Sequence, residues 1–152
     1  MIVSIGCDRT GYNLKVAMAE KLCEAGYELI DHGQFHPDDD LHFPDLARQV
    51  CQSILDGEAQ RGIMFCGTSV GATIACNKIP GIRASTVHDV QCAHQSVEHD
   101  HVQVMTIGEK CIGEWLAWDL IQAFLQAEPH TDDRARLLMT KLFAMDDTPI
   151  NF

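Results

Sequence analysis

Short apolar runs alternate with helix-compatible segments along most of the chain, and this alternation limits the fold more than any other feature. Five runs have the length and composition of buried strands: residues 1–7, 27–33, 61–66, 82–87 and 102–108. Between the first two, Leu14, Met18 and Leu22 recur at helical spacing within residues 11–25. Strands that alternate with helices form a parallel sheet with right-handed crossovers. We therefore expect an α/β fold in which helices cover both faces of the sheet.

Four further segments have the composition of helices that pack on this sheet. They comprise residues 45–56, 89–98, 112–127 and 134–145. The third of these is strongly amphipathic, and its large aromatic side chains are expected to pack inward rather than to bind a ligand. These side chains are Trp115, Trp118 and Phe124.

Length and composition fit a single globular domain, because 152 residues with 46% hydrophobic content can bury a sizeable core. The acidic stretch after Pro129 divides the chain into residues 1–128 and a helical tail, residues 129–152, which we assign to the same domain. No run of 18 or more apolar residues is present, and the N-terminus lacks the features of a signal peptide. We expect a cytoplasmic protein that does not bind a membrane.

Charge and cysteine content exclude two further classes. The net charge of −11 disfavours nucleic acids and anionic membranes as partners, because both require a basic surface. The seven cysteines form no CxxC pair, and their odd number argues against a disulfide framework. We expect reduced thiols, most of them in the core or on the surface.

Two polar clusters follow predicted strands. "GCDRTG", residues 6–11, follows the first strand, and "CGTSVGA", residues 66–72, follows the third. In a parallel sheet, ligands bind at the carboxyl ends of the strands. Neither cluster matches the dinucleotide or P-loop patterns, but both combine glycine with N–H groups at a helix start. Such loops bind an oxyanion or a phosphate.

These clusters, together with "FPDLA", "NKIPGIRA" and "HDHVQVMTIGEKCIG", resemble the signatures of the ribose-5-phosphate isomerase type B family, which includes galactose-6-phosphate isomerase subunits. The resemblance covers residues 2–126. It implies a Rossmann-like three-layer sandwich with a five-stranded parallel sheet, plus a C-terminal helix that packs on a partner subunit. It also implies aldose–ketose isomerisation of a sugar phosphate without a metal or organic cofactor, in a homodimer or tetramer with each site at a dimer interface. The default substrates are ribose 5-phosphate and ribulose 5-phosphate.

The resemblance assigns the proton transfer to the second cluster. Cys66 is the base that removes the C–H proton, and Thr68 moves protons between the two substrate oxygens. Backbone N–H groups of the loop hold the developing oxyanion, which involves Gly67, Ser69 and Gly71. Other family members use a glutamate at the position of Ala72. A thiol at a helix N-terminus is expected to have a lowered pKa.

Other residues match the family's substrate contacts. His99 matches the histidine that opens the sugar ring, and a histidine suits this role because its pKa lies near neutrality. Asp8 matches an aspartate that binds sugar hydroxyls, although an aspartate after a strand also serves as a helix N-cap. Arg9 stands near the expected phosphate position, where its guanidinium can bind bidentately.

Three departures from the family pattern bear on activity. Ser69 replaces a glycine, so either the backbone there needs no positive φ or the loop has a shifted shape. Asp100 replaces an asparagine and puts a carboxylate near a developing anion, which opposes catalysis unless it is turned away or protonated. The family's two arginines four residues apart are represented only by Arg134 and Arg136, which either bind phosphate in another register or lie on an exposed helix.

Several alternatives remain open. The chain could bind a sugar phosphate or another small anion without isomerising it, or it could isomerise a four- or six-carbon sugar phosphate. Cys66 could also be a buried apolar side chain or a redox thiol, although no resolving cysteine is evident. A metal site built from His94, His99, Asp100 and His101 has poor spacing for zinc, so no metal is expected.

Overall fold

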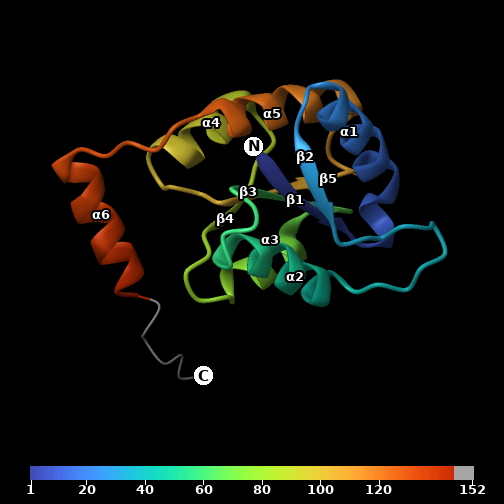
Figure 1. The fold of residues 1–152 in the computed structure, drawn as a ribbon, viewed down its shortest axis with the longest axis horizontal. Coiled ribbons are helices and arrows are strands. Elements are labelled where there is room, and N and C mark those ends of the chain that lie inside the picture. Colours follow the sequence, from blue (N-terminus) through green and yellow to red (C-terminus); the bar gives the residue numbers. More distant parts are fainter. Residues whose placement is uncertain (146–152) are drawn as a thin grey trace.

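The computed structural model describes residues 1–145 and confirms a parallel α/β sandwich (Figure 1). The sheet has five parallel strands in the order β2-β1-β3-β5-β4. The strands are β1 (Ile2–Cys7), β2 (Glu28–Asp31), β3 (Arg61–Cys66), β4 (Ala84–Thr86) and β5 (Val104–Gly108). Each predicted strand is therefore present: β3 has the predicted bounds, and the other four are shorter than predicted.

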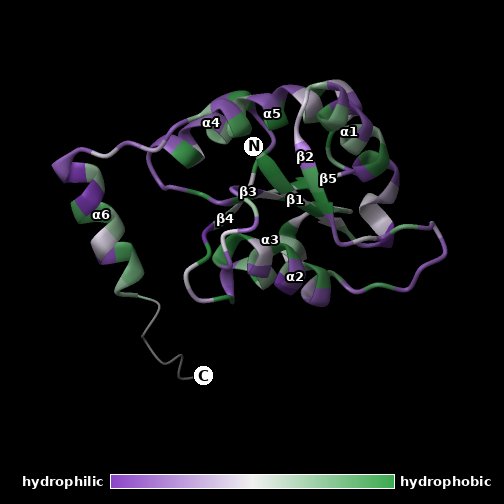
Figure 2. Ribbon diagram, viewed as in Figure 1, coloured by the Kyte–Doolittle hydropathy of each residue, from purple (hydrophilic) through white to green (hydrophobic). Residues whose placement is uncertain are grey.

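Helices cover both faces of this sheet. The helices are α1 (Tyr12–Glu24), α2 (Phe43–Leu55), α3 (Val70–Asn77), α4 (Val90–Glu98), α5 (Glu114–Gln126) and α6 (Asp133–Phe143), with a short 3-10 turn η1 (Arg9–Gly11) before α1. Helices α1, α4 and α5 lie on one face, and α2 and α3 lie on the other (Figure 1). Figure 2 shows hydrophobic strands at the centre and hydrophilic residues on the outer helix surfaces.

The alternation of side chains along each strand divides the core in two. In β3, Ile63 and Phe65 pack with α1, α4 and α5, whereas Met64 and Cys66 pack with α2 and α3. The sulfur of Cys66 therefore leaves the sheet on the face that carries α3. The prediction that Trp115 packs inward is wrong. Its side chain is 90% exposed, because it lies on the outward face of α5, whose Phe124 is fully buried.

Gly11 allows the turn after β1 to press against the end of β3. A Cβ on Gly11 would lie 2.3 Å from the carbonyl carbon of Phe65 and 2.5 Å from the nitrogen of Cys66. No side chain fits between these backbones. The close approach brings the residues that follow β1 alongside the carboxyl end of β3.

Helix α6 stands apart from the layered body (Figure 1). Four of its apolar side chains are exposed: Leu137, Leu138, Leu142 and Phe143. The Arg83 guanidinium carbon lies 4.5 Å from the centre of the Phe143 ring and links the end of the helix to the body. The predicted tail extends beyond the described residues, since positions 146–152 lie outside them. Among residues 1–145, no helix combines the length and apolar composition needed to cross a bilayer.

Candidate active site

The two predicted polar clusters meet at the carboxyl edge of the sheet. Strands β1 and β3 are neighbours, and Cys7 pairs in register with Phe65. The chain leaves β1 for α1 on one face and leaves β3 for α3 on the other face. Two adjacent strands whose connections diverge in this way leave a crevice at their carboxyl ends, where α/β proteins bind ligands.

A thiol and a carboxylate face each other in this crevice. The Cys66 thiol donates to Asp8 Oδ2 over 3.1 Å. The second carboxylate oxygen, Oδ1, accepts from the Thr10 backbone N–H at 2.9 Å and from the Thr10 hydroxyl at 2.6 Å. Asp8 therefore caps the η1 turn with one oxygen, which confirms the predicted N-cap, and accepts from the thiol with the other. Its contact with sugar hydroxyls stays a prediction.

The expected lowering of the Cys66 pKa is wrong. Burial raises the pKa of this thiol, and the hydrogen bond and negative charge of Asp8 raise it further. Hydrogen bonds from Thr10 and the Gly67 backbone act in the opposite direction but are smaller. The residue precedes α3 by three intervening residues, so the end of that helix does not dominate its electrostatics. The resting site holds a neutral thiol bound to a carboxylate.

Ser69 keeps the left-handed backbone that a glycine would adopt, with φ 64° and ψ −7°. Ser69, which stands where the family has glycine, therefore still has positive φ. The serine hydroxyl donates to the Thr68 carbonyl at 2.6 Å and does not cap α3. Because the first turn of a helix has no intrahelical acceptor for its N–H groups, those of Val70, Gly71 and Ala72 at the start of α3 can donate to a bound anion.

Hydroxyl groups behind the loop hold Ser69 in this conformation. The Thr73 hydroxyl donates to the Ser69 carbonyl at 2.9 Å. Its oxygen lies 2.5 Å from the Thr106 hydroxyl of β5 and also contacts the Thr86 hydroxyl of β4. The loop is thereby tied to two strands, which fixes its N–H groups before any ligand binds.

A cavity of about 490 Å³ lies beside Asp8 and Thr10. Arg9 lines it and is exposed, and the acidic residues Asp40 and Asp45 line its opposite wall. Thus Arg9 lies beside two carboxylates, Asp40 from the loop before α2 and Asp45 from the first turn of α2. The positive charge of Arg9 is partly offset by these neighbours.

Lys110 is a second cation that the sequence reasoning missed. Its backbone N–H donates to the Gly67 carbonyl at 2.9 Å. A Cβ on Gly67 would lie 3.7 Å from Lys110 Cδ, so the lysine stem runs along the loop. The sequence carried a signal, because Lys110 lies two residues after the carboxyl end of β5, which is level with Cys66.

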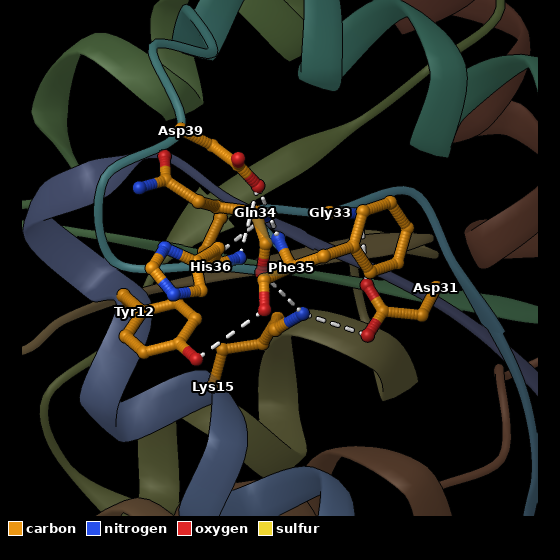
Figure 3. Close-up of polar contacts among 9 residues, drawn as sticks. Tyr12, Lys15, Asp31, Gly33, Gln34, Phe35, His36 and Asp39 are labelled. Atoms are coloured by element: carbon orange, nitrogen blue, oxygen red, sulfur yellow. Dashed lines mark hydrogen bonds and ion pairs between the residues drawn. The ribbon is translucent and has the colours of Figure 1, made fainter.

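The buried Lys15 anchors the loop between β2 and α2 (Figure 3). The end of this loop lines the cavity beside Asp8. Lys15 Nζ donates to Asp31 Oδ2 at 2.7 Å and to the Gln34 carbonyl at 2.8 Å. Within the same loop, Asp39 Oδ2 accepts a hydrogen bond from the backbone N–H of Phe35 at 3.0 Å. These bonds explain how a polar loop keeps a defined shape at the edge of the site.

His99 lies near the amino ends of the strands, opposite the carboxyl ends where Cys66 lies. It follows α4, which runs back toward the amino end of β5. Cys66 pairs with Gly108 and Gly62 pairs with Val104, so the start of β5 is separated from the level of Cys66 by four residues, about 13 Å along the strand. One chain therefore does not bring His99 to its own Cys66.

Arg134 accompanies His99 at this distant edge. A cavity of about 450 Å³ is lined by His99, Asp100 and Arg134, with His130 and Asp132 between them. Arg136, two residues further along α6, is not among the residues that line this cavity. Which of the two arginines binds phosphate stays a prediction. Asp100 also lies here and not beside its own chain's Cys66.

Comparisons with known proteins agree with this geometry. The model of the Ribose/Galactose Isomerase family matches residues 3–141. The "Ribose-5-P isomerase B" of Listeria innocua is 36% identical over 128 residues, covering 84% of this chain and 86% of that protein. The "D-erythrulose-4-phosphate isomerase" of Pectobacterium atrosepticum is 35% identical over 126 residues, covering 83% of each. The solved structure of Clostridium thermocellum ribose-5-phosphate isomerase B superposes with a TM-score of 0.91 at 36% identity, covering 96% and 97% of the two chains.

Fold and site together define an aldose–ketose isomerase that acts on sugar phosphates. The chain belongs to the ribose/galactose isomerase family. The relatives carry names with different sugar phosphates, so membership fixes the reaction class and leaves the individual substrate to be inferred.

Proposed function

We propose that this isomerase interconverts ribose 5-phosphate and ribulose 5-phosphate through an enediolate, with Cys66 as the base and without a metal or organic cofactor. The observation that carries the proposal is the 3.1 Å contact between Cys66 Sγ and Asp8 Oδ2 next to the N-terminus of α3. A weakly acidic C–H proton needs both a base and donors for the charge that develops on oxygen. The crevice supplies both within one loop.

The geometry supports a specific order of proton transfers. Asp8 accepts the thiol proton of Cys66, and the resulting thiolate removes the proton from C2 of the open-chain aldose. The electron pair of that C–H bond forms the C1–C2 double bond of the enediolate, while the N–H groups at the start of α3 face its oxygen. Thr68, which is exposed on the loop, carries a proton between O1 and O2. Cys66 then returns a proton to C1 to give the ketose.

Two cations beside the crevice suit the phosphate of the substrate. Arg9 lines the cavity next to Asp8, and Lys110 runs along the Gly67 loop. A flexible lysine and a bidentate arginine are complementary phosphate ligands. The carboxylates of Asp40 and Asp45 face the same cavity and favour sugar hydroxyls over a second phosphate group.

We infer that the complete site requires two copies of the chain. His99 and Arg134 lie at the amino edge of the sheet, whereas Cys66 lies at the carboxyl edge. A two-fold axis that pairs the two edges brings His99 and Arg134 of one copy to Cys66 of the other. The exposed apolar face of α6 supports this arrangement, because an interface would cover it. A further pairing into tetramers and a cytoplasmic location stay predictions.

Solvent exchange is the most direct test of the chemistry. Deuterium incorporation at C1 or C2 is followed by NMR for four-, five- and six-carbon aldose and ketose phosphates, with the wild type and Cys66→Ala. Exchange with the five-carbon pair that is lost in Cys66→Ala supports the proposal. Preferred exchange with erythrulose phosphate assigns a four-carbon substrate instead. Retained binding without any exchange identifies a non-catalytic relative.

Complementation tests the shared site. Cys66→Ala and His99→Ala are each expected to be poorly active on the cyclic aldose. After the two are mixed and re-equilibrated, half of the dimers pair one variant with the other, and one of their two sites is intact. About one quarter of wild-type activity should therefore return. Activity that stays at the level of the separate variants contradicts a site shared between copies.

A further inference from the structure

Two histidines and a glutamate converge on the surface at the amino edge of the sheet. Glu98 and His99 end α4, and His130 comes from the segment between α5 and α6. One ligand atom of each of these three residues lies within 4.8 Å of the others. This group includes His130, which was not part of the metal set suggested by the sequence.

The two imidazoles already have the separation that a shared metal requires. Their ring centroids are 5.2 Å apart. Two imidazoles bound to one tetrahedral zinc ion, with N–Zn distances of about 2.0–2.1 Å, have centroids roughly 5 Å apart. The rings of His99 and His130 therefore need small rotations, and little displacement, to direct one nitrogen each at a common point.

Hydrogen bonds to its backbone hold the segment that carries His130 in place. The His130 N–H donates to the Glu98 carbonyl at 2.8 Å, and the His130 carbonyl lies 2.8 Å from His101 Nε2. His101 has positive φ, 52°, and is engaged with this backbone rather than being free to act as a ligand. Ligands with a fixed backbone lose less freedom when a metal binds. His101 is thus a support for the group, not a member of it.

The carboxylate of Glu98 lies between two histidines. Its Oε1 is 3.8 Å from His130 Nε2, and its Oε2 is 3.3 Å from His94 Nδ1. Asp100 and Asp132 line the adjoining cavity and add negative charge, while Arg134 opposes it. An excess of carboxylates favours a cation at this place.

We propose that Glu98, His99 and His130 form a binding site for a divalent transition-metal ion, with Zn²⁺ as the best match. Two imidazole nitrogens and one carboxylate oxygen are a zinc donor set that leaves a fourth position for water. The same donors disfavour Mg²⁺ and Ca²⁺, which prefer oxygen ligands. In the single chain, Glu98 is half-buried and His99 and His130 are exposed, so we expect micromolar affinity and reversible binding.

Occupation of this site has a consequence that rests on the proposed function. A metal ion takes the nitrogen lone pair of His99 and prevents this residue from exchanging protons with the sugar ring. Zn²⁺ is therefore an inhibitor of this enzyme and not a cofactor. Inhibition should be stronger with the cyclic aldose than with the open-chain ketose.

The binding test uses the full chain without substrate. Thiols also bind zinc, so the exposed cysteines are replaced in the background by Cys23→Ser, Cys92→Ser and Cys111→Ser. Cys66→Ala is added for the binding measurements, because the proposed dimer brings Cys66 of one copy to His99 of the other. Calorimetric titration with ZnCl₂ is expected to show one ion per chain, and CoCl₂ should give a tetrahedral visible spectrum without a thiolate charge-transfer band.

Single substitutions locate the ion. His130→Ala and Glu98→Gln should each weaken binding by about tenfold or more. His36→Ala is the matched control, because His36 also faces a carboxylate, Asp38, at 3.7 Å on the surface. It should leave the affinity unchanged. Undiminished binding in His130→Ala, or no stoichiometric binding, overturns the proposal. Binding without inhibition upholds the site and argues against ring opening by His99, so the two hypotheses fail separately.

Discussion

The thiol of Cys66 is hydrogen-bonded to the carboxylate of Asp8, 3.1 Å away, although the two residues are 58 positions apart in the chain. The contact exists because β1 and β3 are adjacent and Gly11 lets their carboxyl ends approach closely. In the proposed mechanism, Asp8 is the acceptor for the proton that leaves the thiol before Cys66 acts as a base. The structure thus pairs a protonated thiol with a carboxylate that can accept its proton.

Asp8→Asn is expected to lower the pKa of the Cys66 thiol, because it removes a negative charge that favours the neutral form. The thiol should then be alkylated by iodoacetamide at lower pH than in the wild type, as followed by mass spectrometry of the Cys66 peptide. Thr10→Val is the control of opposite sign, since the Thr10 hydrogen bond lowers this pKa. If both variants shift the pH of alkylation equally and in the same direction, the charge of Asp8 does not control the pKa of Cys66.

Ser69→Gly and Ser69→Ala separate the backbone from the hydroxyl. Both variants lose the bond from Ser69 to the Thr68 carbonyl, but only alanine must still adopt positive φ. The glycine variant should therefore be more stable than the alanine variant by about 1 kcal/mol. Urea denaturation gives the two free energies of unfolding. If alanine is as stable as glycine, the left-handed conformation carries no cost.

Asp31→Asn leaves the ammonium group of Lys15 without its charged partner in a site where the lysine side chain is only 4% exposed. The free energy of unfolding should fall by about 2 kcal/mol, less than for a fully buried pair because the Asp31 side chain is 30% exposed. The double variant Lys15→Met/Asp31→Asn removes both charges and should recover part of the loss. A double variant that is less stable than Asp31→Asn alone would contradict this account of the pair.

Stability should decline at alkaline pH because of Cys7. Burial raises the pKa of this thiol from 9.0 to about 11. The folded state thus keeps a proton that the unfolded chain loses, so the contribution is complete below pH 9 and is lost as pH rises toward 11. Cys7→Ala should flatten the decline of the melting temperature over this range. Cys23→Ala, at an exposed thiol, should not.

The fold was predictable because its signals are local. Each strand is a short apolar run, and five of the six α-helices have their own apolar spacing, so the order of elements follows from residues close together in sequence. Helix α3 was not among the segments predicted from spacing. The position of Cys66 near Asp8 was also predictable, since carboxyl ends of neighbouring parallel strands share one edge. The outward position of Trp115 was not, because it depends on how α5 is rotated against the sheet.

Neither the pKa of Cys66 nor the grouping of His99 with His130 could be predicted from the sequence. The pKa of Cys66 depends on its burial and on the distance to Asp8, neither of which is written in the spacing of the loop. His130 was overlooked because it precedes an acidic stretch that was interpreted only as a break in the pattern. Its proximity to His99 arises from the return of the chain across the amino edge of the sheet.

If two copies share each site, as proposed, the placement of Cys66 and His99 at opposite ends of one sheet makes catalysis sensitive to dilution. A solitary chain then holds Cys66 and His99 in two separate, incomplete sites. Specific activity toward the cyclic aldose should therefore fall as enzyme concentration drops below the dissociation constant of the assembly. In such an assembly, the concentration of enzyme determines the number of complete sites as well as the number of chains.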